Sequence, residues 1–352
     1  MKPDFNKTST FDYPLDETLI AQNPASPRDS ARLMVINKET AKIEHRIFRD
    51  VTDYLKPGDL LVMNDTRVLP ARLEGRKNGT GAKVEIFFLS PVSENQDKWT
   101  ALVKPGRKLP EGTKVTLTGG SVVTVGERLE DGLRYITFSK EDNALDVIHK
   151  NGQTPLPHYI THSTADSEEY QTVYSKLEKE NSVASPTAGL HFTNELLEKI
   201  YASGVEHAFV TLQVGLGTFR PVKTDNVDEH IMHFELCEIP PETAEKINRA
   251  KTEGRRVIAV GTTVVRTLES FAEKSAEYGR IQPGIMNSNL FIRPGFDYKI
   301  VDALITNFHL PKSTLLMLVA AFAGYDTVMA AYKEAMEQKY RVFSFGDATM
   351  WY

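Results

Sequence analysis

Short apolar runs separated by turn residues fill the segment from residue 59 to residue 139. The separators, such as Gly119-Gly120 and Glu130-Asp131-Gly132, are typical of tight turns between strands. Six short strands without long helices predict a small closed β-barrel. The expected strands are Leu60–Met63, Val84–Leu89, Trp99–Val103, Val115–Leu117, Val122–Val125 and Tyr135–Phe138.

Helical and strand patterns alternate on both sides of this segment. Thr193 can N-cap a helix that ends at Gly204, and Ser313–Phe322 is apolar on all sides, which predicts a buried helix. Further helices are expected at Pro241–Lys251 and Val264–Phe271, and strands at Phe209–Val214 and Val257–Val260. The predicted fold class is a multidomain α/β (α+β) protein. A larger mixed α/β domain, 1–58 plus 153–352, is interrupted by an inserted six-stranded all-β barrel domain at 59–152.

The composition is that of an ordinary globular protein. The chain has 352 residues, enough for about two domains, with 41% hydrophobic and 25% charged residues. A single cysteine, Cys237, excludes an internal disulfide and fits a reducing compartment. The first residues lack the apolar stretch of a signal peptide, and the longest apolar run, Leu315–Ala323, is about half of a membrane span. We therefore expect a soluble, cytoplasmic monomer with no membrane partner.

The net charge of −5 argues against a general nucleic-acid coat protein, so an RNA enzyme of this composition must gather its cations locally. For any single cluster, a solvated surface is the commoner interpretation. The candidate clusters are Arg67, Arg72, Arg76 and Lys77; Lys104, Arg107 and Lys108; and Lys251, Arg255 and Arg256.

Polar islands in the larger domain carry the candidate chemistry. Ser185–Phe192 is a turn-rich loop before a helix, where backbone amides can hold a carboxylate or phosphate, although a tight turn with a locally bonded His191 is by itself the slightly favoured interpretation. Gly215-Leu216-Gly217 follows a strand and allows a ligand close to the backbone, but it lacks the third glycine of a dinucleotide fingerprint.

His230, His233 and Glu235 form the densest constellation. The same residue types could hold a metal ion, which leaves a metal-dependent hydrolase open as an alternative function. Two imidazoles near a carboxylate suit proton transfer at neutral pH better.

Two further islands lie where strands pass into helices. Thr262 and Thr263 precede Arg266 at a helix start, where hydroxyls and amides bind anions or ribose oxygens, or simply cap the helix. Asn307 and His309 stand between an apolar strand and an apolar helix, a place where polar groups are costly unless they are bonded or used. Four such islands in one domain favour an active site.

Long motifs make the chain similar to the S-adenosylmethionine:tRNA ribosyltransferase-isomerase family. The resemblance runs from about Asp12 to Asp347. It is carried by Pro57–Arg67, Tyr170–Tyr174, Val183–Phe192, Val210–Phe219, His230–His233, Val257–Arg266, Thr306–Leu315 and Phe345–Asp347.

The chain departs from the family pattern at a few positions. Gln213 replaces a usual histidine, so it is not an indispensable proton carrier, and Phe345 replaces a frequent tyrosine. Asn287-Ser288-Asn289 replaces a usual Asp-Thr pairing, which puts a local carboxylate role in doubt. Ser185 stands where alanine is usual, with no expected consequence.

The resemblance implies an activity. Family members transfer and isomerise the ribosyl moiety of S-adenosylmethionine onto 7-aminomethyl-7-deazaguanine at the tRNA wobble position, which gives epoxyqueuosine-tRNA and releases adenine and methionine. S-adenosylmethionine is a co-substrate, and no metal or other cofactor is expected. A conventional S-adenosylmethionine methyltransferase is a second alternative, but no Gly-rich strand–loop–helix with an acidic ribose contact is evident.

Residue roles follow as hypotheses. His230 or His233 is the expected base, Glu235 orients it or shares the proton, and Asn307 and His309 are donors to ribose or adenine. Donor-binding residues are expected to be Thr187, His191, Gly215, Gly217, Thr262, Thr263 and Arg266, with Arg266 as a bidentate carboxylate clamp. Contacts to the tRNA anticodon stem-loop are expected from Arg67, Arg72, Arg76, Lys104, Arg107 and Lys108 on one basic face. The four islands are expected to meet at one cleft.

Overall fold

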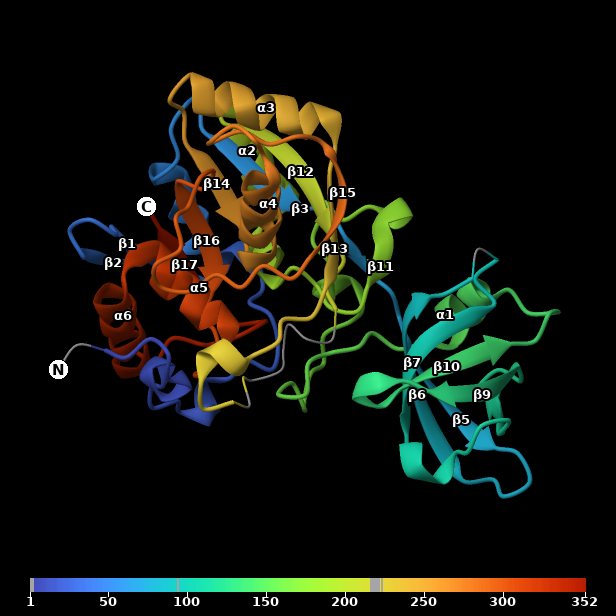
Figure 1. Ribbon diagram of the computed structural model, residues 1–352. Helices are drawn as coiled ribbons and strands as arrows, with labels where there is room; N and C mark the ends of the chain where they lie inside the picture. Colours follow the sequence, from blue (N-terminus) through green and yellow to red (C-terminus); the bar gives the residue numbers. More distant parts are fainter. Residues whose placement is uncertain (1–2, 94, 216–221, 223) are drawn as a thin grey trace. The chain divides into compact units, whose positions relative to one another are not determined.

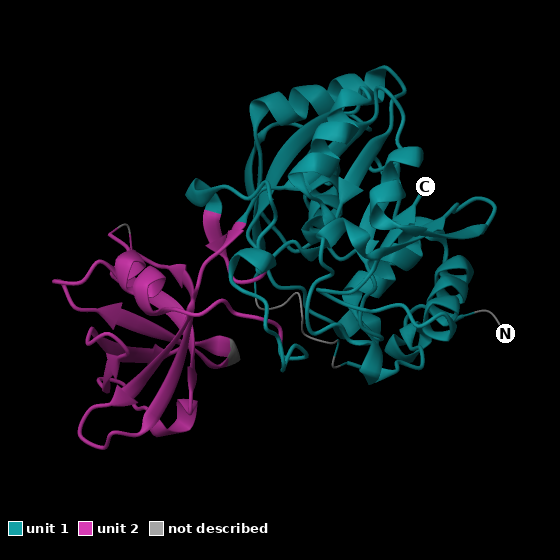
Figure 2. Cartoon of the chain, turned by 180° about the vertical axis from the view of Figure 1, so that it is seen from behind, with its two compact units in different colours: residues 1–66, 158–179, 185–352 teal, residues 67–157, 180–184 magenta. Residues whose placement is uncertain are grey.

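The computed structural model describes residues 3–93, 95–215, 222 and 224–352. Two compact units divide the chain (Figure 2). Unit 1 comprises Met1–Thr66, His158–Lys179 and Ser185–Tyr352, and unit 2 comprises Arg67–Pro157 and Glu180–Ala184. The domain boundaries expected from the sequence stay predictions.

Unit 1 is built on one large mixed sheet (Figure 1). Four central strands, in the order β12-β3-β14-β16, run parallel, so their carboxyl ends meet at one edge. The strands of the sheet, within the described residues, are β1 (Arg32–Ile36), β2 (Ile43–Ile47), β3 (Leu60–Asn64), β12 (Glu206–Leu212), β13 (Glu235–Ile239), β14 (Val257–Val260), β15 (Gly284–Ser288), β16 (Ala303–Asn307) and β17 (Ala348–Trp351).

Helices cover both faces of this sheet. The central strands β3, β14 and β16 are buried along their whole length, as parallel strands with two covered faces should be. The helices of unit 1 are α2 (Asn194–Ala202), α3 (Pro241–Thr252), α4 (Thr262–Lys274), α5 (Thr314–Ala323) and α6 (Tyr325–Glu337).

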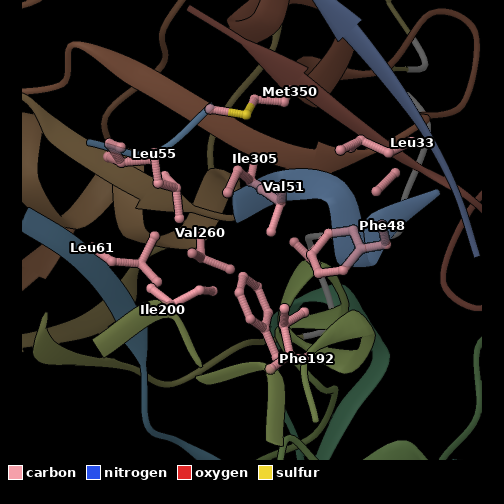
Figure 3. Close-up of a cluster of buried hydrophobic side chains, with 14 of the residues drawn as sticks. Leu33, Phe48, Val51, Leu55, Leu61, Phe192, Ile200, Val260, Ile305 and Met350 are labelled. Atoms are coloured by element: carbon pink, nitrogen blue, oxygen red, sulfur yellow. The ribbon is translucent and has the colours of Figure 1, made fainter. Parts of the chain in front are cut away.

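One face of the sheet packs on α2 and on the 3₁₀ turn Phe48–Asp53. Figure 3 shows the apolar side chains that meet there, with Phe48 and Phe192 edge to face at 4.9 Å between ring centroids. Ile200 of α2 contributes to the same cluster. The cluster takes Leu61 and Met63 of β3 and no residue of α3 or α4. Since these two helices also contact β3, β12 and β14, they occupy the opposite face.

The sequence predicted the local signals of this unit well. Thr193 accepts a hydrogen bond from the amide of Leu196 and caps α2, and α5 is the buried helix expected before Gly324. The strand expected at Phe209–Val214 is displaced, since β12 spans Glu206–Leu212.

Unit 2 contains the closed barrel, in the order β10-β7-β6-β5-β8-β9, which confirms the predicted fold class. One strand was assigned wrongly: Leu60–Met63 lies at the centre of the large sheet, and β5 takes its place in the barrel. The elements of unit 2 are β4 (Arg67–Val68), β5 (Arg72–Lys77), β6 (Lys83–Pro91), β7 (Lys98–Lys104), β8 (Lys114–Leu117), β9 (Val122–Arg128), β10 (Leu133–Phe138), α1 (Ala144–Asn151) and β11 (Glu180–Ser182).

No single helix among the described residues has both the length and the apolar character of a membrane span. The bent pair α5–α6 meets that test together, across a bend of 118°.

Candidate active site

A cavity of about 660 Å³, measured to its open mouth, lies at the carboxyl ends of β14 and β16. Ligands of open α/β sheets bind at this edge. We call it the main cavity. Among the described residues, its lining includes no Asp, Glu, Lys or Arg. The lining residues are Tyr159, Ser185, Pro186, Thr187, Ala188, Val214, Gly261, Thr262, Thr263, Thr306, Asn307, Phe308, His309, Leu310, Ser313, Leu315, Phe343 and Ser344.

Hydrogen bonds fix the polar groups of the main cavity. Asn307 donates to the carbonyl of Phe343 at 3.1 Å and accepts from the hydroxyl of Thr187 at 2.9 Å. The side chain of Asn64, buried at the end of β3, donates to the Thr263 hydroxyl at 3.4 Å and to the carbonyl of Leu212 at 3.1 Å. The loop Ser185–Phe192 and the segment with Asn307 and His309 therefore meet at the main cavity.

The alternative of simple capping by Thr262 or Thr263 is wrong. Gly261 is the N-cap residue of α4, and no side chain caps the helix. Its φ of 92° lies in the left-handed region that favours glycine, and this conformation presents both threonines to the main cavity.

His309 lies in the wall of the main cavity as a neutral imidazole. Burial lowers its pKa to about 3. Its Nδ1 is 3.3 Å from the hydroxyl of Tyr332 and its Nε2 is 3.3 Å from that of Thr306. The hydroxyl of Tyr13 donates to the His309 carbonyl at 2.7 Å, so the residue is held from three sides.

Neutral His309 should make stability depend on pH. Because its folded pKa lies below the ordinary value near 6.5, the unfolded chain takes up the proton first as pH falls. The contribution of neutral His309 to the free energy of unfolding is complete above pH 6.5. It is lost between pH 6.5 and 3, at up to about 1.4 kcal/mol per pH unit. Urea unfolding at pH 7 and pH 5 should show a loss that is smaller in His309→Asn, and an equal loss in both proteins would contradict the assignment.

A second, smaller cavity of about 330 Å³ holds charged groups. It is lined by His230, Met232, His233, Glu235, Arg266, Thr314 and Leu315. We call it the ion-pair cavity, because Glu235 and Arg266 form a salt bridge in which both side chains are buried.

One guanidinium nitrogen of the Glu235–Arg266 pair has no hydrogen-bond partner among the described residues. The Glu235 carboxylate also accepts the Gly215 amide at 3.1 Å, and Nε of Arg266 donates to the carbonyl of Leu290 at 3.4 Å. Nη2 of Arg266 is buried and has no hydrogen-bond partner among the described residues. A ligand carboxylate can accept hydrogen bonds from this nitrogen. Nη1 is bound to Glu235, and the bidentate clamp expected from the sequence stays a prediction.

The two histidines differ in environment. His230 is partly buried against Phe291, with ring centroids 5.7 Å apart, whereas His233 is exposed. Burial and the neighbouring His233 lower the pKa of His230, so this imidazole is neutral at pH 7 and able to accept a proton.

Leu315 at the start of α5 lines both cavities. The main cavity, which holds His309, therefore adjoins the ion-pair cavity, which holds the His230–Glu235 segment. His191 lines neither cavity; it is buried, stacked on Phe48 at 4.9 Å and bonded to the carbonyl of Gly346 at 2.9 Å. Gly217 lies outside the described residues.

Sequence reasoning missed the lining residues Tyr159, Ser344 and Leu315, and it missed Asn64, which bonds to the lining residue Thr263. Asn64 was part of the motif that carries the family resemblance, and its position at the end of an apolar run was a usable signal. Ser185 was noted but given no role.

Within the described parts of the chain, no group of three His, Cys, Asp or Glu side chains is arranged to hold a metal ion. The expectation of no cofactor stays a prediction.

The six cations of the predicted RNA face fall into two sets within unit 2. Arg67 lies 3.6 Å from Glu180 with its side chain 15% exposed, and Arg72 donates to the carbonyl of Leu156 at 3.5 Å, so both make contacts inside the unit. The exposed set is Arg76, Lys104, Arg107 and Lys108. Lys77, next to Arg76, donates to the carbonyl of Lys108 at 3.0 Å, which ties β5 to the turn 106–108.

The fold and the two adjoining cavities define an α/β enzyme with an inserted β-barrel. The family model described as queuosine biosynthesis protein matches residues 8–351. The chain is 52% identical over 347 residues to the S-adenosylmethionine:tRNA ribosyltransferase-isomerase of Thermotoga maritima, covering 98% of this chain and 99% of the relative. It is 51% identical to the protein of the same name from Desulfitobacterium hafniense, with the same coverage.

A crystal structure of an S-adenosylmethionine tRNA ribosyltransferase from Thermotoga maritima is similar, with a TM-score of 0.56 and 40% identity, over 97% of this chain and 99% of that chain. The chain belongs to the queuosine biosynthesis protein family, and its curated relatives are named S-adenosylmethionine:tRNA ribosyltransferase-isomerases. The comparisons give no support to a metal-dependent hydrolase or a methyltransferase.

Proposed function

We propose that this protein transfers and isomerises the ribosyl moiety of S-adenosylmethionine onto 7-aminomethyl-7-deazaguanine at the wobble position of tRNA. The products are epoxyqueuosine-tRNA, adenine and methionine. The observation that carries the proposal is the pair of adjoining cavities in a chain about 52% identical to enzymes of that name: one uncharged and rich in hydroxyls, the other holding a buried ion pair and two histidines.

The donor lies across both cavities, over Leu315. The main cavity suits its nucleoside part, since Thr187, Thr262, Thr263, Asn307 and neutral His309 offer hydrogen bonds without charge. The unused Nη2 of Arg266 suits the methionine carboxylate.

The chemistry needs a neutral base beside the donor's 5′ carbon. The adjacent sulfonium acidifies that carbon, and His230 or His233 removes its proton to leave an ylide. The ylide carbon expels the ring oxygen from C4′ to form a vinyl sulfonium, and the oxygen freed at C1′ collapses to an aldehyde as adenine departs with the glycosidic electron pair and takes up a proton. The aminomethyl nitrogen of the RNA base adds to C4′ of the vinyl sulfonium and loses a proton, and the regenerated ylide carbon attacks the C1′ aldehyde to close the five-membered carbon ring. The resulting C1′ alkoxide displaces methionine from C5′ and forms the epoxide. Glu235, which accepts hydrogen bonds from Arg266 and the Gly215 amide, orients the base.

The anticodon stem-loop is proposed to bind unit 2. A wobble base must leave its stack to reach the donor, so phosphate contacts are needed to hold the loop meanwhile. Arg76, Lys104, Arg107 and Lys108 are the exposed cations for this task. The enzyme acts as a cytoplasmic monomer and needs no metal or further cofactor.

Replacing Arg107 and Lys108 by alanine should weaken tRNA affinity and flatten its salt dependence by roughly one unit of slope per lost phosphate contact. Filter binding between 50 and 200 mM salt measures both quantities. The control is Lys140→Ala with Lys150→Ala, two exposed lysines elsewhere in unit 2, which should leave the slope unchanged. If the salt dependence of tRNA affinity in the Arg107 and Lys108 variant equals that of the wild type, these two cations do not contact the RNA.

The function itself is tested by incubating the protein with S-adenosylmethionine and tRNA that contains the 7-aminomethyl-7-deazaguanine precursor. Free adenine and methionine are expected, in amounts equal to the modified tRNA, and activity should persist in chelator. Formation of S-adenosylhomocysteine instead would indicate a methyltransferase, and loss of activity in chelator would indicate a metal-dependent enzyme.

A further inference from the structure

The main cavity contains a hydroxyl that the folded chain does not use. Ser185 is 3% exposed, its side chain lines the cavity, and its Oγ is buried without a hydrogen-bond partner among the described residues. Buried polar groups are normally bonded, because leaving one unpaired costs stability. In the free protein, a methyl group at this position would therefore be more favourable than the unpaired hydroxyl.

The surroundings of Ser185 indicate the kind of ligand that could pair with it. On the same cavity wall the hydroxyls of Tyr159 and Ser344 lie 2.7 Å apart and already satisfy each other. The apolar rings of Phe308 and Phe343 complete the lining. A wall of hydroxyls and aromatic rings without formal charge fits a heteroaromatic base or a sugar, and it fits a charged amino-acid head poorly.

We infer that Ser185 is a specificity-determining contact, whose hydroxyl hydrogen-bonds the nucleoside part of the donor. This inference rests on the proposed function for the identity of the donor. The charged head has its own place at the Arg266 donor in the ion-pair cavity, so the uncharged half falls to the main cavity. Ligand binding supplies the partner that Ser185 lacks in the free protein.

Ser185→Ala should separate affinity from stability. Removing a hydroxyl with no partner in the free protein should leave the melting temperature unchanged or raise it. The same change should raise the KM for S-adenosylmethionine by about five- to tenfold, with kcat within about twofold of wild type. If Ser185 had a purely structural role, its replacement would not raise the KM. Nor would affinity fall while the melting temperature stayed unchanged or rose.

Thr172→Val is the matched control. Thr172 is equally buried and its Oγ1 is also without a partner among the described residues, but it lines neither cavity. This nearly isosteric change should leave the KM at its wild-type value. A comparable rise in KM in both variants would show a general effect of cavity packing and overturn the inference.

Calorimetry with adenosine separates the inference from the proposed function, because binding needs no turnover. Adenosine affinity should fall in Ser185→Ala by the same factor as S-adenosylmethionine affinity. If the wild type releases adenine but Ser185→Ala binds adenosine normally, the role of Ser185 is wrong and the function stands. If adenosine affinity falls but the wild type releases no adenine from S-adenosylmethionine, the proposed function fails while the contact remains.

Discussion

Arg266→Met is expected to destabilise the folded protein by about 3–5 kcal/mol and to abolish detectable donor binding. The loss of stability follows because Glu235 would keep a buried carboxylate with its counter-ion removed. The loss of affinity follows because Nη2 of Arg266 is the unused donor of the ion-pair cavity. Urea unfolding measures the first effect and calorimetry with S-adenosylmethionine measures the second.

The double variant Glu235→Gln with Arg266→Met separates the two effects. Removing both charges abolishes the buried unpaired ion, so most of the stability should return, while donor affinity stays lost. Arg256→Met is the matched control, since Arg256 pairs with buried Asp59 away from both cavities and should lower stability alone. Donor binding restored in the double variant would show that Arg266 serves the fold and does not touch the ligand.

Hydrophobic periodicity predicted the helices and strands of this fold better than it predicted which strands pair with one another. The barrel strand β5 was missed because its sequence, Arg72–Lys77, offers only Leu73 and Gly75 to the interior, so the apolar signal is weak. Leu60–Met63 was placed in the barrel because it precedes the barrel strands directly, but its uninterrupted apolar run is typical of a parallel strand buried on both faces. Apolar pattern alone does not say which sheet a strand joins.

The candidate site was predicted at the level of segments. The loops that line the main cavity follow strands or begin helices, and such positions are readable in a sequence. Pairings across space are not: Glu235 and Arg266 lie on different elements, and nothing local to either predicts their contact. His191 faces the core and not the cavity, and Ser185 is informative only once its burial without a partner is known.

His233→Ala is expected to lower the rate of adenine release by ~10²-fold or more while donor affinity stays near wild type. The imidazole lines the ion-pair cavity but is exposed, so its removal should leave the fold intact. The measurement is single-turnover adenine release with saturating tRNA and S-adenosylmethionine. Wild-type release from this variant would exclude His233 from proton transfer and leave His230 as the candidate base.

The pH profile then distinguishes the two histidines. The pKa of His230 is lowered by burial and by the adjacent His233, so a reaction that uses His230 as base keeps its rate below pH 6.5 and loses it only at more acidic pH. In His233→Ala the imidazole that helps to lower the pKa of His230 is gone, so this pKa should rise. If His230 is the base, the acidic limb of the residual activity should shift upward accordingly. In His230→Ala this limb should disappear, and a limb unchanged in both variants would place the base outside this pair.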